Sequence, residues 1–129
     1  MKARILLIED NPQNRYLATF LLERRGHEVI QAETGMLGLE LAAGAGPDLI
    51  LLDIQLPGMD GHAVARAIKA DPELKSIPII AVTSYAMVGD REKCLAAGAE
   101  GYIEKPINPE TFVAEVERFL RPAHREDAP

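Results

Sequence analysis

The sequence predicts an α/β fold built on a five-stranded, doubly wound parallel sheet in the strand order 2-1-3-4-5, the flavodoxin-like (βα)5 arrangement. Short apolar runs recur along the chain, and several are continuous rather than alternating, as strands buried on both faces require. A helical pattern follows each run. Strands that alternate with helices through short connections form a parallel sheet covered by helices on both faces.

The strands are expected at residues 5–8, 29–30, 49–52, 79–82 and 102–103. The first helix begins at Asn11 and Pro12, which supply an N-cap and a proline at the first helical position. A glycine after a pair of arginines ends this helix. Its apolar residues Leu17, Phe20 and Leu21 share one face, so we expect that face to pack on the sheet.

Three further helices are expected at about residues 34–43, 61–70 and 89–97. The last helix repeats the design of the first, because Asn108 and Pro109 again supply an N-cap and a first-turn proline. Residues 1–121 are therefore expected to form one domain. The polar residues 122–129 are expected to form a flexible C-terminal tail.

Composition and charge exclude several classes of protein. Acidic residues outnumber basic ones by 20 to 14, so the general field repels phosphate backbones and direct nucleic-acid binding is not expected. No apolar run reaches the length of a signal peptide or of a membrane span, which predicts a cytoplasmic protein without a membrane contact. The single cysteine, Cys94, is expected to be a small buried hydrophobe. His27, His62 and His124 show no ligand spacing, so no transition-metal site is assigned.

Polar side chains follow the predicted strands at their carboxyl ends, where ligands bind in open parallel sheets. Glu9 and Asp10 follow the first strand, and Asp53 follows the third. Thr83 ends the fourth strand, and Lys105 comes shortly after the fifth. Taken singly, these residues have structural alternatives: acids favour a helix N-terminus, a threonine can cap a turn, and a lysine can be a solvated loop residue. Asp53 is harder to explain structurally, because a carboxylate at the tip of a doubly buried strand needs a cation or hydrogen-bond donors.

Packing three carboxylates together limits the chemistry of this crevice. They repel one another, so one must stay protonated or a cation must join them. Mg²⁺, which takes oxygen ligands, suits such a site and is usual in phosphoryl chemistry. A carboxylate can also attack phosphorus and form an aspartyl phosphate. The residues therefore predict Asp53 as the nucleophile, Glu9 and Asp10 as metal ligands, and Lys105 and Thr83 as groups that contact the phosphoryl oxygens.

In combination these residues resemble a known family, the CheY-like receiver domain of two-component response regulators. The resemblance spans about residues 3–120. It is carried by the following motifs: Ile8-Glu9-Asp10-Asn11, the stretch from Asp53 through Pro57 and Asp60 to Gly61, Thr83 after an apolar strand, and Lys105-Pro106 before a final helix. Receivers of this kind are stand-alone proteins or parts of hybrid histidine kinases, and the initial methionine favours a stand-alone regulator.

The resemblance implies that Asp53 is the phosphoacceptor for a histidine kinase or histidine phosphotransfer protein. It also implies that Mg²⁺ is held by Glu9, Asp10, Asp53 and the backbone carbonyl of Gln55. Many relatives have aspartate where this chain has Glu9, and the longer side chain is expected to alter the metal geometry without abolishing binding.

The resemblance further implies that Lys105 pairs with the phosphoryl group and that Pro106 follows it in a cis peptide bond. Thr83 is expected to shift toward the phosphoryl oxygen and Tyr102 to turn inward. The structural alternative for Tyr102 is a half-buried strand aromatic with its hydroxyl at the surface. The surface formed by the fourth helix, fifth strand and fifth helix would then bind a downstream protein target.

Two other functions share parts of this pattern. A flavin-binding module of the same topology needs a Gly/Ser/Thr-rich phosphate loop after the first strand, whereas this chain has Asp10-Asn11-Pro12 there. A phosphohydrolase with an aspartyl intermediate needs a second acid two residues after a nucleophile on the first strand, and Pro12 occupies that position. Both alternatives are therefore disfavoured.

Overall fold

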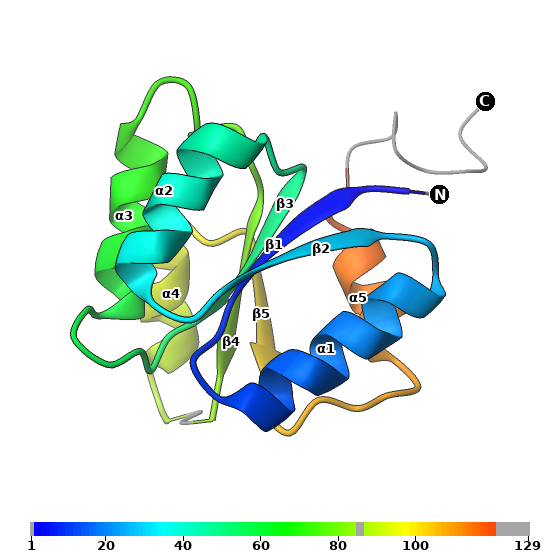
Figure 1. Cartoon of the computed structure of the whole chain (residues 1–129). Coiled ribbons are helices and arrows are strands. Elements are labelled where there is room, and N and C mark those ends of the chain that lie inside the picture. The colour runs from blue at the N-terminus through cyan, green and yellow to red at the C-terminus, as the bar shows by residue number, and fades with distance from the viewer. Residues whose placement is uncertain (1, 85–86, 121–129) are drawn as a thin grey trace.

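The computed structural model of the chain describes residues 2–84 and 87–120 (Figure 1). The tail expected at residues 122–129 lies outside these described residues. In the part of the chain that is described, each helix is too short or too polar to cross a lipid bilayer.

Five parallel strands form one sheet in the order β2-β1-β3-β4-β5, which confirms the predicted topology (Figure 1). The strands are β1 (Arg4–Ile8), β2 (Glu28–Ala32), β3 (Leu49–Asp53), β4 (Ile79–Thr83) and β5 (Gly101–Glu104). The strand order reverses between β1 and β3, so this is the point at which the carboxyl ends of the strands open a crevice.

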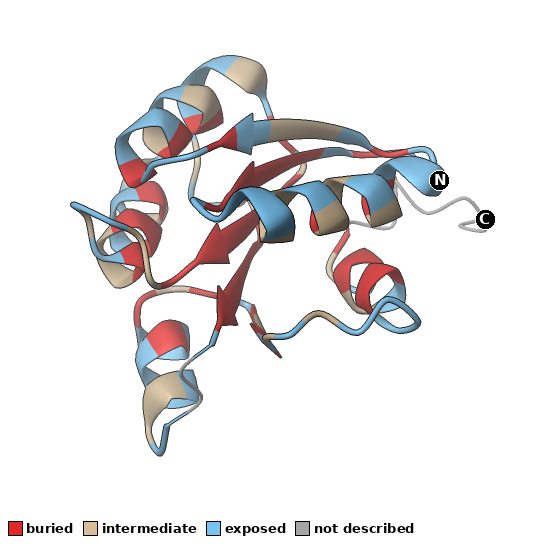
Figure 2. Cartoon of the chain, turned by 60° about the horizontal axis from the view of Figure 1, so that its bottom comes forward, coloured by how far each residue is buried: buried red, intermediate tan, exposed pale blue. Residues whose placement is uncertain are grey.

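Helices cover both faces of the sheet. They are α1 (Pro12–Arg24), α2 (Gly35–Ala45), α3 (Gly61–Ala70), α4 (Asp90–Ala96) and α5 (Phe112–Glu117). Helices α1 and α5 lie on one face, and α2, α3 and α4 lie on the other (Figure 1). The central strands are consequently buried on both sides, and every residue of β3 and β4 is buried (Figure 2).

Successive side chains of the central strands enter two separate cores. Leu6 and Ile50 belong to the core under α2, α3 and α4, whereas Ile5 and Leu49 belong to the core under α1 and α5. This alternation follows from the two-residue period of a strand and explains why the apolar runs are continuous in the sequence. The rigid edge of the sheet is therefore fixed from both faces.

A buried histidine links α5 to the start of the sheet. The Ala3 N–H donates to His27 Nδ1 at 3.1 Å, so the ring proton lies on Nε2, which donates to Glu117 Oε2 at 2.8 Å. Arg25 Nη2 donates to Glu117 Oε1 at 2.9 Å. These contacts hold α5 against the loop between α1 and β2.

The last helix begins later than the sequence predicts. A helix was expected from Asn108, but α5 begins at Phe112. The Asn108 side chain accepts a hydrogen bond from the Glu110 N–H at 2.9 Å, and its carbonyl accepts from the Thr111 and Phe112 N–H groups. Asn108 and Pro109 thus form a turn that precedes the helix, because the asparagine side chain competes for the backbone donors.

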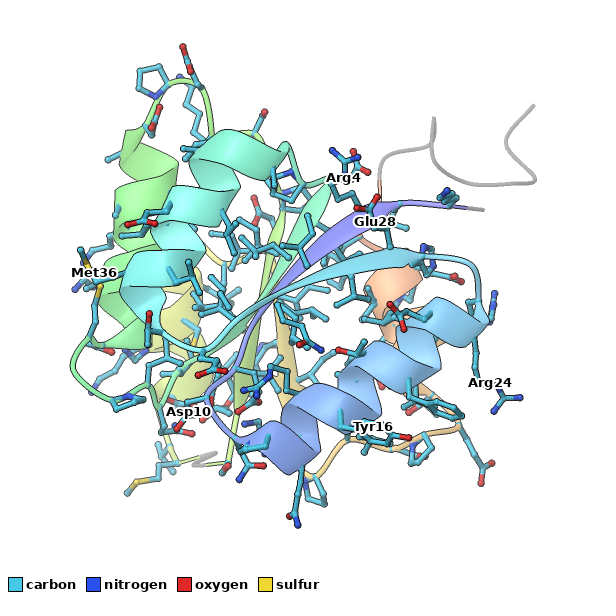
Figure 3. All side chains as sticks on the ribbon, viewed as in Figure 1. Arg4, Asp10, Tyr16, Arg24, Glu28 and Met36 are labelled. Carbon is cyan, nitrogen blue, oxygen red and sulfur yellow. The ribbon has the colours of Figure 1, made fainter. Side chains whose placement is uncertain are left out.

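The buried face of α1 also differs from the prediction. Phe20 was expected to pack on the sheet, but it is 46% exposed, and Ala18 and Leu22 are buried instead. Phe20 stacks on Tyr16 with ring centroids 6.2 Å apart, and the Arg24 guanidinium lies 5.6 Å from the Phe20 ring centroid. Each of these three residues is four positions from the next along α1, and Tyr16 and Arg24 lie on the outer side of the helix (Figure 3).

The start of α3 packs tightly against the loop that follows β3. A Cβ atom on Gly61 would lie 2.6 Å from Ile54 Cα and 2.8 Å from the Asp53 carbonyl oxygen, both of which are backbone atoms. The Gly61 N–H donates to the Ile54 carbonyl at 3.1 Å. Only glycine permits this approach, which fixes the backbone just beyond Asp53.

We predict that Gly61→Ala lowers the free energy of unfolding by about 2–3 kcal/mol, because the added methyl group meets backbone that cannot move aside. Gly44→Ala is the matched control. No atom lies within 4 Å of a Cβ at Gly44, so the same change on α2 should stabilise the protein by about 0.5–1 kcal/mol. Urea unfolding of both variants measures the difference. Equal stability of the two variants would contradict the close packing at Gly61.

Candidate functional site

Glu9 and Asp53 lie side by side because they end adjacent strands. Ile8 pairs with Leu52 in the register of β1 and β3, and the two acids are the next residues along each strand. Each is only 3% exposed. Lys105 Nζ lies 2.7 Å from Glu9 Oε1 and 3.3 Å from Asp53 Oδ2. Two buried carboxylates from neighbouring strands therefore share one ammonium group.

Asp10 adds a third carboxylate at the mouth of this crevice. One oxygen from each of Glu9, Asp10 and Asp53 lies within 4.8 Å of the others. Asp10 is exposed and lies in the loop between β1 and α1 (Figure 3). The arrangement has two buried acids and one acid open to solvent, so an ion can reach it without a rearrangement of the core.

The charges at this site are not balanced. Burial raises the pKa of Asp53, and the nearby Glu9 carboxylate raises it further. Lys105 and the hydrogen bond from the Gln55 N–H act in the opposite direction but do not cancel these effects. In the described part of the chain, Lys105 is the one basic side chain that pairs with either buried acid. The site therefore favours either a shared proton or an additional cation.

Both the side chain and the backbone carbonyl of Glu9 contact the beginning of α1. Its Oε2 accepts a hydrogen bond from the Asn11 N–H at 3.1 Å, and Arg15 Nη1 donates to the Glu9 carbonyl at 3.1 Å. The N-cap of α1 is Asn11, whose side chain accepts from the Asn14 N–H at 2.9 Å. A carboxylate is not needed to cap this helix, so helix stabilisation does not explain why Glu9 is buried beside Asp53.

Lys105 is not a solvated loop residue, because its side chain is only 9% exposed and is held by the two acids. The peptide bond between Lys105 and Pro106 is cis, the isomer that the resemblance implies. The Lys105 N–H donates to the Thr83 carbonyl at 2.8 Å. This bond ties the residue to the end of β4 and directs it toward the crevice.

Gln55 connects the ends of β3 and β4 through its side chain. Its backbone N–H donates to Asp53 Oδ1 at 3.0 Å, and its Nε2 donates to Thr83 Oγ1 at 2.6 Å. Its Oε1 accepts from the Ser84 N–H at 3.1 Å. The family resemblance implied that the carbonyl of Gln55 is a metal ligand, and it did not specify these side-chain contacts. The side-chain role could have been anticipated from its position two residues beyond Asp53, opposite the end of the neighbouring strand.

Tyr102 does not contact the acidic crevice in this structure. Its hydroxyl donates to Asp90 Oδ2 at 2.6 Å, at the first residue of α4, and its ring is partly buried against the core under α2, α3 and α4. Burial raises the pKa of Tyr102, and the bond to Asp90 adds to the effect. The hydroxyl is thus neither free at the surface nor directed to Thr83, and it links β5 to α4.

The residues of the crevice fit a hard divalent cation. Three carboxylates converge from β1 and β3, and a single lysine offsets part of their charge. Mg²⁺ prefers oxygen ligands, binds few of them from the protein, and keeps several water molecules. The raised pKa of Asp53 indicates that the negative charge of the site is not fully compensated, and a bound cation would compensate it.

Comparison with known proteins decides the family. Residues 5–117 match the family described as the response regulator receiver domain. The chain belongs to the response regulator receiver domain family. It is therefore a signalling domain of two-component systems, whose receiver domains act with histidine kinases. Membership in this family leaves the flavin-binding and phosphohydrolase alternatives without support.

Individual relatives cover nearly the whole receiver domain. The polar-differentiation response regulator DivK of Brucella ovis is 42% identical over 120 residues, which are 93% of this chain and 98% of DivK. The chemotaxis protein CheY4 of Vibrio cholerae is 30% identical, with a TM-score of 0.87 over 93% of this chain and 100% of that one.

A third relative is the receiver domain of a sensor histidine kinase from Pseudomonas aeruginosa PAO1. It is 35% identical, with a TM-score of 0.84 over 92% of this chain and 98% of its own. That structure has a magnesium ion coordinated in its active site cleft. Receivers from free-standing regulators and from kinases therefore share this fold.

We predict that Asp53→Asn stabilises the metal-free receiver at neutral pH. The folded-state pKa of Asp53 is raised above its ordinary value of 3.8, so ionising this group in the folded protein costs free energy. That cost is absent at pH below the unfolded-state pKa, grows between the unfolded-state and folded-state pKa values, and is fully present above the folded-state pKa. The variant should melt higher than the wild type at pH 7 in a chelator, and the gap should close toward pH 4.

Asp60→Asn is the control for this prediction. Burial opposes ionisation of Asp60, but hydrogen bonds from His62 outweigh it and lower the pKa of Asp60. The same substitution there should not raise the melting temperature at pH 7. A wild-type receiver that is more stable than Asp53→Asn at pH 7 would contradict the charge imbalance in the crevice.

We also predict that Lys105→Met destabilises the metal-free receiver by about 2–4 kcal/mol, because it leaves two buried carboxylates without their ammonium partner. Adding Mg²⁺ should restore more stability to this variant than to the wild type. Lys75→Met, at an exposed lysine, should change the unfolding free energy by less than about 0.5 kcal/mol. Denaturant unfolding with and without Mg²⁺ measures both. Equal stability of Lys105→Met and the wild type would show that Lys105 does not compensate these acids.

Proposed function

We propose that Asp53 accepts a phosphoryl group from the phosphohistidine of a histidine kinase or histidine phosphotransfer protein, and that this modification switches a protein-binding surface. The observation that carries the proposal is the buried Asp53 carboxylate, 3.3 Å from Lys105 Nζ and flanked by Glu9 and Asp10. A carboxylate in this position is held rigidly at the tip of β3 and is ready to attack phosphorus.

In the proposed reaction an Asp53 oxygen attacks the phosphorus of the donor. The new oxygen–phosphorus bond forms as the bond between phosphorus and the donor imidazole breaks, and the leaving imidazole takes up a proton. The Gln55 N–H holds Oδ1 of Asp53, and Lys105 lies beside Oδ2. These contacts orient the nucleophile before the donor arrives.

Glu9, Asp10, Asp53 and the carbonyl of Gln55 would hold Mg²⁺, which would supply charge neutralisation for the transferred group. Lys105 would exchange its contact with Glu9 for a phosphoryl oxygen. Thr83 Oγ1 accepts from Gln55, and a hydroxyl can accept one hydrogen bond while donating another. In the proposal, Thr83 shifts toward the phosphoryl group and donates to one of its oxygens. The same site would later direct water to the aspartyl phosphate, so that the domain removes its own phosphoryl group.

The proposed switch begins at Thr83 and ends at Tyr102. A phosphoryl group adds close to two negative charges and draws Thr83 and Lys105 toward it. Tyr102 lies on β5, which pairs with β4 and so with the strand that ends at Thr83. Its hydroxyl contacts Asp90 of α4. A phosphoryl group can shift this equilibrium only by its different affinity for the two conformers.

The proposed output surface consists of α4, β5 and α5. Two exposed apolar residues lie here, Val88 just before α4 and Leu95 within it. We propose a downstream protein as the partner here, and not a nucleic acid, because the chain has a net charge of −6. The reduced thiol of Cys94 agrees with a cytoplasmic location for this exchange.

We predict that incubation with acetyl phosphate and Mg²⁺ adds a single labile phosphoryl group, measured as the intact mass of the protein. The adduct should require Mg²⁺ and should be absent in Asp53→Asn. Asp60→Asn, the same change seven residues further along, is the matched control and should be modified as the wild type is. An adduct that persists in Asp53→Asn would move the nucleophile to another residue and overturn the proposal.

A further inference from the structure

A second group of potential metal ligands lies between α3 and α4. His62 is near the start of α3, and Asp90 and Cys94 lie one turn apart on α4. One ligand atom from each of the three residues lies within 4.8 Å of the others. The proposed phosphoryl transfer at Asp53 does not use this arrangement.

We propose that His62, Asp90 and Cys94 form a binding site for a thiophilic divalent transition metal such as Zn²⁺. We call these three residues the α3–α4 site. The proposal is independent of phosphoryl transfer at Asp53.

The distance between the Cys94 sulfur and the His62 Nε2 suits tetrahedral coordination. Cys94 Sγ lies 3.7 Å from His62 Nε2. A zinc ion with ordinary bond lengths to sulfur and nitrogen would hold these two atoms about 3.6 Å apart at a tetrahedral angle. Asp90 supplies a carboxylate oxygen, and one of its two oxygens already accepts the Tyr102 hydroxyl at 2.6 Å. Three protein ligands and one water would complete the coordination.

The orientation of His62 is the second observation that indicates a metal. Its Nδ1 lies 3.0 Å from Asp60 Oδ1, which also accepts the His62 backbone N–H at 3.0 Å. The carboxylate accepts the Nδ1 proton, which leaves the Nε2 lone pair directed toward Cys94. A carboxylate that fixes the far nitrogen of a histidine in this way is typical of zinc sites.

Solvent reaches this region from one side. A hollow of about 350 Å³ between α3 and α4 is lined by Asp60, His62, Arg66 and Lys93 together with two alanines. The side chain of His62 is 16% exposed, whereas Cys94 is buried beneath it. Of the three proposed ligands, His62 lines this hollow.

A nucleophilic cysteine is the main alternative for this group. Burial raises the pKa of the Cys94 thiol to about 11, and the charges of Asp90 and Asp60 add to the effect. Such a thiol is a poor nucleophile, because the thiolate is the reactive form. A divalent cation reverses this preference: the Cys94 sulfur bonds to the metal, and its proton passes to solvent.

Cobalt titration of the full-length, reduced protein tests the proposal. The chain has one cysteine, so a thiolate-to-cobalt charge-transfer band reports on Cys94 alone. We expect one equivalent of Co²⁺ to give this band together with the visible bands of a tetrahedral site. Zn²⁺ should abolish both. Asp53→Asn should keep them, which separates this site from the acidic crevice.

The variants identify the remaining ligands. Cys94→Ser should lose the band, and His62→Gln and Asp90→Asn should each weaken cobalt binding by at least about 10-fold. Asp60→Asn should weaken it by about 10–100-fold, the usual effect of removing the carboxylate behind a metal-bound histidine.

Thermal melting of each variant shows whether a loss of metal binding is due to poor folding. The Zn²⁺-induced rise in melting temperature, taken relative to each variant's own metal-free value, should be larger in the wild type than in Cys94→Ser, in which only the acidic crevice still binds the ion. Absence of a thiolate band in the wild type would overturn the proposal. A band unchanged by both His62→Gln and Asp90→Asn would also overturn it, because it would show cobalt bound to the thiol alone.

Discussion

The organisation of this receiver domain depends on one ammonium group shared between two buried carboxylates. Lys105 lies 2.7 Å from Glu9 and 3.3 Å from Asp53, and both acids are almost fully removed from water. Two carboxylates that would repel each other can be buried only if something compensates them. Lys105 compensates part of their negative charge. A divalent cation would compensate the remainder, and the cation and Lys105 together would bind a phosphoryl group.

The fold brings these three residues together because of its strand order. β1 and β3 are adjacent, so the residues that end them meet directly, and β4 separates β3 from β5. Lys105 must therefore extend across the end of β4, which a long side chain can do. Its N–H bond to the Thr83 carbonyl anchors it there, and Gln55 bridges the same gap from β3 to Thr83. Thr83 thus contacts Lys105 on one side of the crevice and Gln55 on the other. A structural change at the crevice can therefore be transmitted through Thr83.

Much of this arrangement could be predicted from the sequence because it depends on backbone order. Continuous apolar runs require strands buried on both faces, and the residues that end such strands must share one edge of the sheet. What the sequence could not predict depends on competition between side chains and on helix rotation. Asn108 caps a turn rather than a helix, and the rotation of α1 leaves Phe20 exposed. The approach of His62 to Cys94 likewise depends on how α3 and α4 are rotated against each other, which residue spacing does not show.

Diffraction at the manganese absorption edge tests the central claim most directly, with Mn²⁺ as the probe for Mg²⁺ in crystals of the full chain. We expect an anomalous peak between Glu9, Asp10 and Asp53, about 2.1 Å from a carboxylate oxygen of its ligands, with the Gln55 carbonyl and water completing the coordination. Lys105 should stay beside the acids. A crevice without a peak, with Glu9 and Asp53 still held by Lys105 alone at saturating Mn²⁺, would contradict it.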